Sequence, residues 1–293
     1  MDEKEAEAKK PRFEFKNYKI LLVIPLIVLL ISAGILVNGY MQTGDWFKRS
    51  IELKGGTLIN IESDKPVDTS ALENSLAGKF GLLTVREIRS FSGYGILIEA
   101  SSEVNANNII QEVKNFGITV QSFSVQTIGP ALGATFWIQA QLGLAVAFIF
   151  MGIIVFVIFR TLVPSLAVIL AAAFDILFTL AFMQVFDIEL SLAGLAALLM
   201  LIGYSVDTDI LLTTRSLKGT GMVGQRIYGA MKTGLTMTFT AIGALAAMLI
   251  FTASPVLTQI ASVLLIGLVF DIMNTWITNA ALLKWYMERK GIV

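Results

Sequence analysis

Five ionisable residues lie inside otherwise apolar segments of this 293-residue sequence, and they are the residues best placed to do chemistry. An aspartate at the centre of a membrane helix costs about 3 kcal/mol on insertion scales, whereas a leucine gains roughly 0.5 kcal/mol. Such groups should therefore face a bundle interior, a partner protein or water. Protonation of a carboxylate removes much of the cost of burial, so these positions are candidates for a proton relay. They are Asp175, Asp207, Asp209, Asp271 and Lys232.

Each of these residues also has a purely structural interpretation. Asp175 and Asp271 could bond neighbouring hydroxyls or amides and pin helices together, and Lys232 could extend to the membrane surface. Asp207 and Asp209 are two residues apart, about 200° around a helix, so they cannot share one face. One of the two is then expected to function, while the other caps the helix or meets solvent.

The composition places these residues in a membrane protein. The chain is 55% hydrophobic and only 15% charged, whereas ordinary globular domains are about 25% charged. Basic and acidic residues number 22 each, so the net charge is zero and no nucleic-acid-binding surface is indicated. The chain contains neither Cys nor His, which excludes disulfides and Cys-based metal sites and leaves proton transfer to carboxylates, Lys, hydroxyls or water. No metal and no cofactor are expected.

Six apolar segments are long enough to cross a hydrocarbon core of about 30 Å, which takes around 20 helical residues. The first, expected over residues 20–40, follows a charged segment (1–19) and has no small-residue cleavage site after it, which indicates an uncleaved anchor. A five-helix transmembrane bundle is expected over residues 136–286, before a short tail at 287–293. Its spans are expected at 140–159, 163–185, 190–212, 231–251 and 255–283.

Residues 41–135 have the pattern of a folded domain between the first span and the others. Apolar and polar residues alternate over 57–62, as in a half-buried strand. Ser70 and Glu73 have the spacing of a capping box that opens a helix, and Gly81 would end that helix. With strands at 83–89, 95–99 and 119–127 and a second helix at 106–116, the expected order is β-α-β-β-α-β. That order is typical of an α+β ferredoxin-like domain.

The placement of basic residues predicts the orientation of the chain. Lys and Arg occur in the N-terminal segment, the turn at 160–162, the linker at 215–221 and the C-terminal tail, whereas the turns at 186–189 and 252–254 have none. By the positive-inside rule, both termini are expected to be cytoplasmic. Residues 41–135 would then form an extracytoplasmic domain, and the even number of spans agrees with two termini on one side of the cytoplasmic membrane.

Four short motifs, spread in order over most of the chain, resemble those of the SecD/SecF family of the RND superfamily. One span, an outer domain and five clustered spans also resemble half of an RND-type unit, as in the SecF branch. The matching segments are LKGGT at 53–57, IGPALG at 128–133, AFD at 173–175 (the family has Ala-His-Asp) and GYSVDTD at 203–209 (the family has Gly-Tyr-Ser-x-Asn-Asp). Their motif-like residues are Gly55, Gly56, Gly129, Pro130, Gly203, Tyr204 and Ser205, with Arg215 further on.

The chain departs from the bacterial pattern of this family in the fourth and fifth spans. The family's functional aspartate aligns with Thr208, so Asp207 or Asp209 would take its role. Asp207 is favoured because it keeps the helix face closer to Ser205 and Thr208. Lys232 stands where the bacterial pattern has an Arg, and a Lys loses its proton on burial more readily than an Arg does. These differences resemble an archaeal-type member.

The resemblance implies a function, a mechanism and partners. SecF-type subunits work with a SecD-like six-helix subunit and the Sec translocon channel, and use the proton-motive force to help preproteins across the lipid membrane. In that mechanism Asp207 or Asp209 binds and releases a proton, with Lys232 as its counter-charge, and the helices shift between two packings that move the outer domain. One charge crossing 100 mV gains about 2.3 kcal/mol, which is enough to bias such an equilibrium. The chain is not expected to be an enzyme.

Three other functions stay open on the sequence alone. A stand-alone proton-coupled transporter of a small solute would be active in liposomes without a partner, although six spans are half of an RND unit. An intramembrane aspartyl protease would use Asp175 and Asp207 as a dyad, but the sequence has no Gly-x-Gly-Asp motif. A peptide-cleavage assay that Asp175→Asn leaves unchanged would exclude the protease. A structural subunit would tolerate both Asp207→Asn and Asp209→Asn without loss of export.

Overall fold

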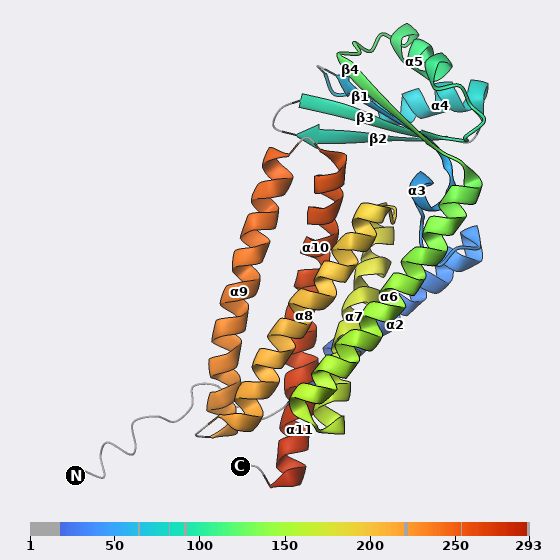
Figure 1. Ribbon diagram of the computed structural model, residues 1–293. Coiled ribbons are helices and arrows are strands. Elements are labelled where there is room, and N and C mark those ends of the chain that lie inside the picture. Colours follow the sequence, from blue (N-terminus) through green and yellow to red (C-terminus); the bar gives the residue numbers. More distant parts are fainter. Residues whose placement is uncertain are drawn as a thin grey trace.

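The computed structural model describes residues 18–63, 65–81, 83–90, 93–219, 222–252 and 254–291. It consists of a bundle of long helices with a small sheet and its helices seated across one end (Figure 1). Within these described residues, six helices are long and apolar enough to cross a membrane. The basic cluster expected before the first span, from Lys4 to Lys16, lies outside the described residues.

The long helices follow the six apolar segments, with several longer than expected. Helix α6 begins at Pro130 instead of residue 140, because a proline suits the first helical position and the preceding Gly129 is its N-cap. Helix α9 also begins before its apolar stretch, and α8 continues past residue 212. The bounds are α1 (Tyr18–Leu21), α2 (Val23–Thr43), α6 (Pro130–Phe159), α7 (Leu162–Val185), α8 (Leu192–Lys218), α9 (Val223–Phe251) and α10 (Pro255–Met273), which continues through the π-helical segment η1 (Asn274–Asn279) into α11 (Ala280–Lys290).

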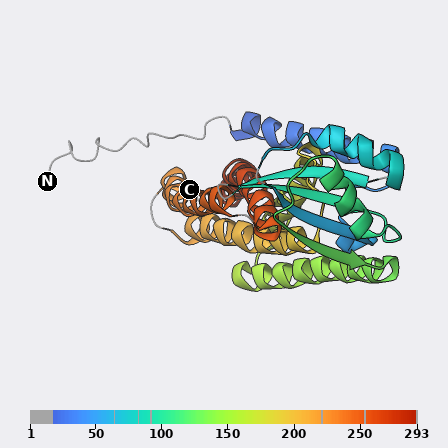
Figure 2. The ribbon, with the colours of Figure 1, turned by 90° about the horizontal axis from the view of Figure 1, so that it is seen from above.

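Helices α7, α8 and α10 form the centre of the bundle. Helices α7 and α8 bury about half of their most apolar stretch, whereas α2, α6 and α9 present most of their surface outward. Viewed from above, α2 and α6 flank the bundle on opposite sides (Figure 2). Residues that belong to the centre therefore face other helices, and this is where buried polar groups can be satisfied.

The part of the chain between α2 and α6 forms a four-stranded sheet with two covering helices, which we call the sheet domain (residues 51–128). Its strands are all antiparallel and lie in the order β2-β3-β1-β4. The element order is β-α-β-β-α-β after one short helix. The elements are α3 (Ile51–Lys54), β1 (Gly56–Ser63), α4 (Thr69–Phe80), β2 (Leu83–Ser90), β3 (Gly93–Ala100), α5 (Ala106–Asn115) and β4 (Ser122–Ile128).

The two faces of this sheet have different chemistry, because successive side chains on a strand point to opposite faces. Ile59, Ile61, Ile96 and Ile98 are fully buried on the face that packs against α4 and α5. The opposite face carries polar and charged side chains, among them Glu99, and it lies over the end of the helix bundle (Figure 1). We call this second face the open face of the sheet.

The cap of α4 differs from the expected capping box. Asp68 is the N-cap, and its carboxylate accepts a hydrogen bond of 3.0 Å from the N–H of Ala71. Glu73 instead accepts a hydrogen bond of 3.0 Å from the N–H of Val85 and so ties the helix to β2. The capping-box prediction for Ser70 and Glu73 was therefore wrong, since the helix begins one residue before Ser70.

Replacing Asp68 with Ala is expected to destabilise α4 by about 1 kcal/mol, because one N–H of the first turn loses its acceptor. Hydrogen exchange of the α4 amides in the full chain should speed up accordingly. The matched control is Ser70→Ala, which should leave the exchange of the same amides nearly unchanged. Equal acceleration in the two variants would contradict the assignment of the cap.

Candidate functional site

Three of the predicted acids come together in the middle of the bundle. Asp175 on α7, Asp209 on α8 and Asp271 on α10 are each fully buried, with 0% exposure. Asp271 interacts electrostatically with both of the other carboxyl groups. We call these three residues the carboxyl cluster.

Asp175 joins three helical segments through two short hydrogen bonds. The Oγ of Ser205 on α8 donates to its Oδ2 at 2.6 Å, and the Nδ2 of Asn274 in η1 donates to its Oδ1 at 2.6 Å. Hydrogen bonds to a charged acceptor are about twice as strong as those between neutral groups. The charge state of Asp175 therefore influences how α7, α8 and η1 pack.

Asp209 and Asp271 are held by hydroxyl and amide donors as well. The Oγ1 of Thr275 donates to Asp271 at 3.0 Å, and the Oγ1 of Thr208 lies 3.4 Å from its Oδ2. The Nδ2 of Asn279 donates to Oδ1 of Asp209 at 2.6 Å. The other oxygen of Asp209 is buried and has no hydrogen-bond partner among the described residues.

Most of the donors to the cluster come from one irregular segment of the last span. Asn274, Thr275 and Asn279 are fully buried and lie within η1, which winds as a π-helix. Such wider turns are rare and occur frequently at functional sites. The sequence shows these polar residues following Asp271, but no pattern in it indicates the π-helical turn that directs them to the cluster.

The polar face of α8 continues beyond the cluster toward Lys218. Thr213 and Ser216 are fully buried, and their hydroxyls have no hydrogen-bond partner within the described part of the chain. With Ser205, Thr208 and Asp209 they follow helical spacing, which places them on one face. Sequence reasoning missed Thr213 and Ser216, although their spacing of four and seven residues from Asp209 was the available signal.

Asp207 and Lys232 lie outside the carboxyl cluster. Both are exposed in the chain, Asp207 on α8 and Lys232 on α9. Because Asp207 and Asp209 point to opposite sides of α8, burial of Asp209 turns Asp207 outward. Asp207, which sequence reasoning favoured, is thus separated from the carboxyl cluster. Asp209 faces the interior of the bundle instead.

The remaining residues of the fourth-span motif also divide between the two sides of α8. Ser205 is buried against Asp175, whereas Gly203 and Tyr204 are exposed. Arg215 lies near the end of α8, where its Nη1 donates to the carbonyl of Gly229 at 3.0 Å and to Oγ1 of Thr233 at 2.9 Å. Arg215 therefore fastens α8 to α9 and does not reach the carboxyl cluster.

The glycine motifs at the two ends of the sheet domain pack against each other. Gly55 and Gly56 have φ of 86° and 149°, a region that favours glycine. A Cβ on Gly55 would lie 2.6 Å from Cα of Pro130, and one on Gly133 would lie 2.6 Å from N of Gly55. Gly129 caps α6 next to this contact. The two motifs thus form one junction where the chain enters and leaves the sheet domain.

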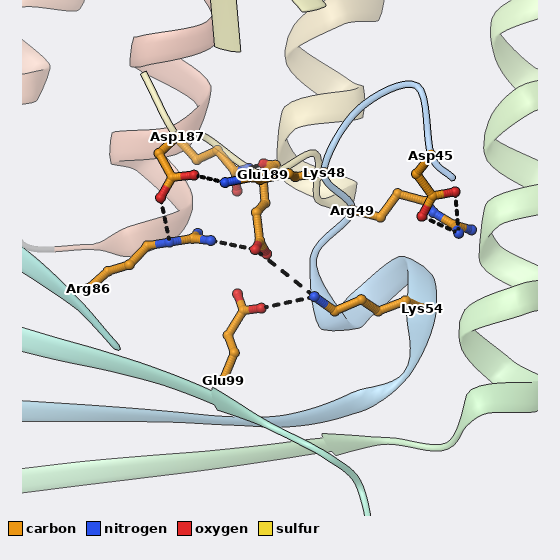
Figure 3. A network of polar contacts seen from close by, with 9 residues as sticks. Asp45, Lys48, Arg49, Lys54, Arg86, Glu99, Asp187 and Glu189 are labelled. Carbon is orange, nitrogen blue, oxygen red and sulfur yellow. Dashed lines mark hydrogen bonds and ion pairs between the residues drawn. The ribbon is translucent and has the colours of Figure 1, made fainter. Parts of the chain in front are cut away.

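A second group of charged side chains lies between the sheet domain and the bundle (Figure 3). It combines Lys54 of α3, Arg86 of β2 and Glu99 of β3 with Asp187 and Glu189 of the α7–α8 connection. In the sequence, Asp187 and Glu189 were noted only as members of a turn that has no basic residue. In the part of the chain that the structure describes, no group of acids has an arrangement that could hold a metal ion.

Comparisons with known proteins place the chain in a family. Residues 108–289, more than half of the chain, match the family model "Protein export membrane protein SecD/SecF, C-terminal". The protein-export membrane protein SecF of Methanothermobacter thermautotrophicus is 40% identical over 280 residues, which cover 93% of this chain and 94% of that protein. The SecF of Pyrococcus furiosus is 40% identical over 274 residues, with 93% and 92% covered.

Solved structures show the same fold. The SecDF of Thermus thermophilus, described as a translocon-associated membrane protein, superposes with a TM-score of 0.72 at 20% identity. The match covers 94% of this chain but only 39% of the SecDF chain. A SecDF structure in a super-membrane-facing form gives a TM-score of 0.55 at 21% identity, covering 97% of this chain and 40% of that one.

The two SecF relatives, each of which matches 93% of this chain, are named as protein-export membrane proteins and not as enzymes. Their identity and coverage, together with the six candidate spans and the SecDF fold, agree with one another. The chain belongs to the SecF branch of the SecD/SecF family of protein-export membrane proteins.

Proposed function

We propose that this chain is the SecF subunit of a SecD–SecF pair that uses the proton-motive force to help preproteins cross the cytoplasmic membrane. The observation that carries the proposal is the carboxyl cluster of Asp175, Asp209 and Asp271, which is fully buried at the centre of the span-forming helices. Among the described residues, the hydrogen-bond donors to these acids are hydroxyls and amides. Three unpaired charges so close together would be very costly in a low-dielectric interior. A cluster that takes up and releases protons avoids that cost.

The hydrogen bonds of the cluster supply the link between a proton and a movement. A carboxylate only accepts hydrogen bonds, whereas a protonated carboxyl group also donates one. A proton arriving at Asp209 or Asp271 therefore changes which of the donors on α8 and η1 can stay bound. Helices that have two alternative hydrogen-bond arrangements can switch between two packings. Thr213 and Ser216 extend the polar face and offer a route for protons along α8.

We place both termini in the cytoplasm and the sheet domain outside, as an extracytoplasmic ferredoxin-like domain. The strand order β2-β3-β1-β4 and the two helices on one face support the fold assignment. Arg215 and Lys218 end α8 at the bundle end away from the sheet domain, whereas Asp187 and Glu189 connect α7 to α8 beside it. That distribution of charge supports the orientation by the positive-inside rule.

An exposed polar stripe on α8 and α9 supports the need for a SecD-like partner. Gly203 and Asp207 on α8 and Lys232, Thr236 and Thr240 on α9 are all exposed in the chain. Charged groups facing lipid are costly, and small residues such as glycine allow helices to approach closely. A second six-helix subunit packed against α8 and α9 would cover this stripe, and it would complete a unit of which this chain matches about two fifths.

Gly203→Trp is expected to weaken copurification of the tagged chain with its SecD-like subunit by about tenfold, because an indole would hold the two helix surfaces apart. The matched control is Gly143→Trp on α6, since both glycines are exposed and an added Cβ at either meets no atom within 4 Å. Equal recovery of the partner with both variants would contradict this placement of the interface.

The proposed role is tested by export in cells that lack the chain and in cells that regain it. The account predicts that restoring the chain speeds up preprotein export and that an uncoupler abolishes this gain. Export that does not change on restoration, or a gain that persists with the uncoupler, would contradict the proposal. Proton-coupled solute uptake by the chain alone in liposomes would instead support the stand-alone transporter.

A further inference from the structure

A cavity of about 470 Å³ lies between the open face of the sheet and the end of the helix bundle. The sheet contributes side chains from all four strands, and the bundle contributes the α7–α8 connection and the first turns of α10. Glu99 of β3 enters from the sheet side, and Glu189 enters from the bundle side (Figure 3). This contact is where the sheet domain would have to separate from the bundle if it moved.

Glu99 and Glu189 form a buried carboxyl pair across this contact. Their exposures are only 7% and 6%. The two carboxyl groups face each other across the contact (Figure 3), and the Nζ of Lys54 lies near both of them. Oε2 of Glu189 is buried without a hydrogen-bond partner among the described residues, and Oε2 of Glu99 is buried with only the Nζ of Lys54 near it, at 3.6 Å. Two ionised carboxylates cannot hydrogen-bond to each other, but a single proton held between them satisfies both.

Both members of the pair stand on fixed backbone. Glu99 lies in the ladder of β3, opposite Leu58 on one side and Thr84 on the other. The carbonyl of Glu189 accepts a hydrogen bond of 2.5 Å from Nε2 of Gln259. The next residue, Leu190, is paired by backbone hydrogen bonds with the segment before α3. Separation of the two carboxyl groups therefore requires movement of one whole unit against the other.

We propose that Glu99 and Glu189 share one proton that fastens the sheet domain to the helix bundle, so that loss of this proton loosens the contact and frees the domain to move. The pair is a proton-binding site separate from the carboxyl cluster inside the bundle. The inference goes beyond the proposed export role and does not depend on it, because it concerns only the contact between two parts of this chain.

The charged groups around the pair are nearly balanced. Arg86 forms an ion pair with Glu189, and the Nζ of Lys54 lies 3.6 Å from Glu99 and 4.0 Å from Glu189. The other charged groups that face the cavity are acids. They are Glu52 of α3, Glu87 of β2 and Asp187 of the α7–α8 connection, of which Asp187 is paired with Lys48. Strands β1 and β4 and helix α10 contribute only uncharged side chains to the lining.

Burial, together with the neighbouring Glu189, raises the pKa of Glu99 from its ordinary 4.5 to about 7, although Arg86 and Lys54 act in the opposite direction. A freed sheet domain would expose Glu99 to water and return its pKa toward the ordinary value. The docked state therefore binds this proton more tightly than the freed state. Docking is strongest below about pH 4.5 and weakens as pH rises from there to about 7, by about 300-fold at most.

The test measures the distance between the two units directly. The chain has no Cys, so a spin label reacts only with cysteines that are introduced. We place them at Lys114→Cys on α5 and Ile250→Cys near the end of α9, which are both exposed positions. The full chain is placed in lipid nanodiscs, where both sides experience the same pH. We expect one short distance at low pH and a longer population at high pH, with the change falling between about pH 4.5 and pH 7. A distance distribution that does not change with pH would overturn the proposal.

Two variants separate this proton from general effects of pH. Glu99→Gln mimics the protonated side chain and should hold the short distance at both extremes of pH. Glu112→Gln is the matched control on α5, since the hydrogen bond from Lys79 holds the pKa of Glu112 below its ordinary value, and it should respond to pH as the unmodified chain does. If Glu99→Gln does not fold, Glu189→Gln carries the same expectation. A pH response that persists in Glu99→Gln or in Glu189→Gln would also overturn the proposal.

Discussion

Replacing Asp209 with Asn is expected to abolish the part of preprotein export that an uncoupler removes, while Asp207→Asn leaves that part intact. Asp209 is fully buried and bonded to Asn279, whereas Asp207 is exposed on the other side of the same helix. An asparagine cannot take up or release a proton, so residue 209 no longer binds a proton on which the membrane potential can act. One charge crossing 100 mV gains about 2.3 kcal/mol, a bias of about 50-fold that the variant would lose.

The measurement is the rate of preprotein export in membrane vesicles with an imposed proton gradient, with and without uncoupler. Asp207→Asn is a closely matched control, because it makes the same chemical change two residues away in α8. Although Asp207 lies on the surface proposed to meet the SecD-like subunit, asparagine has the same size and stays polar, so both variants should assemble with that subunit to the same extent, which copurification checks. Equal loss of uncoupler-sensitive export in the two variants would contradict the assignment of Asp209 to the proton path.

Gly55→Ala is expected to lower the free energy of unfolding by about 2–4 kcal/mol, because it adds a side chain at an unfavourable backbone conformation and in an occupied space. Gly55 has a φ of 86°, and its Cβ would lie 2.6 Å from Cα of Pro130. The neighbouring atoms are backbone and cannot rotate away. The junction between the sheet domain and α6 would have to open.

Gly129→Ala is the matched control for the junction. This glycine caps the same helix, has an ordinary φ of −66°, and an added Cβ there meets no atom within 4 Å. Unfolding of the full chain in detergent, followed by circular dichroism against denaturant, should show a large loss of stability for Gly55→Ala and little change for Gly129→Ala. Similar stability of the two variants would show that the junction is not tightly packed.

The spans and the general position of the acids could be predicted from the sequence because lipid imposes a simple rule. A chain segment must be apolar over about 20 residues to cross, and a charge within it is conspicuous. Which acid faces inward was predicted wrongly although the sequence holds a signal for it, because helical spacing puts Asp209, and not Asp207, on the polar face with Ser205 and Ser216. Tertiary packing against α7 and α10 decides that Asp209 is buried and Asp207 is exposed.

Contacts between distant parts of the chain could not be predicted from the sequence, for a different reason. Glu99 and Glu189 lie in a strand and in a connection between membrane helices, and nothing local to either residue predicts that they meet. The π-helical turn of η1 could not be predicted either, because one extra residue in a helical turn leaves no periodic pattern in the sequence. The two glycine motifs were visible as motifs, but their mutual contact depends on how the sheet domain closes onto α6.

Proton flux tests the central claim, that the buried carboxyl cluster carries protons for export, most directly. Liposomes with a pH-sensitive dye inside would contain this chain, its SecD-like subunit and the translocon, with a preprotein engaged in the channel. The account predicts that an imposed proton gradient drives protons through the assembly and that Asp209→Asn stops this flux. The same flux in the Asp209→Asn assembly as in the unmodified one would contradict it.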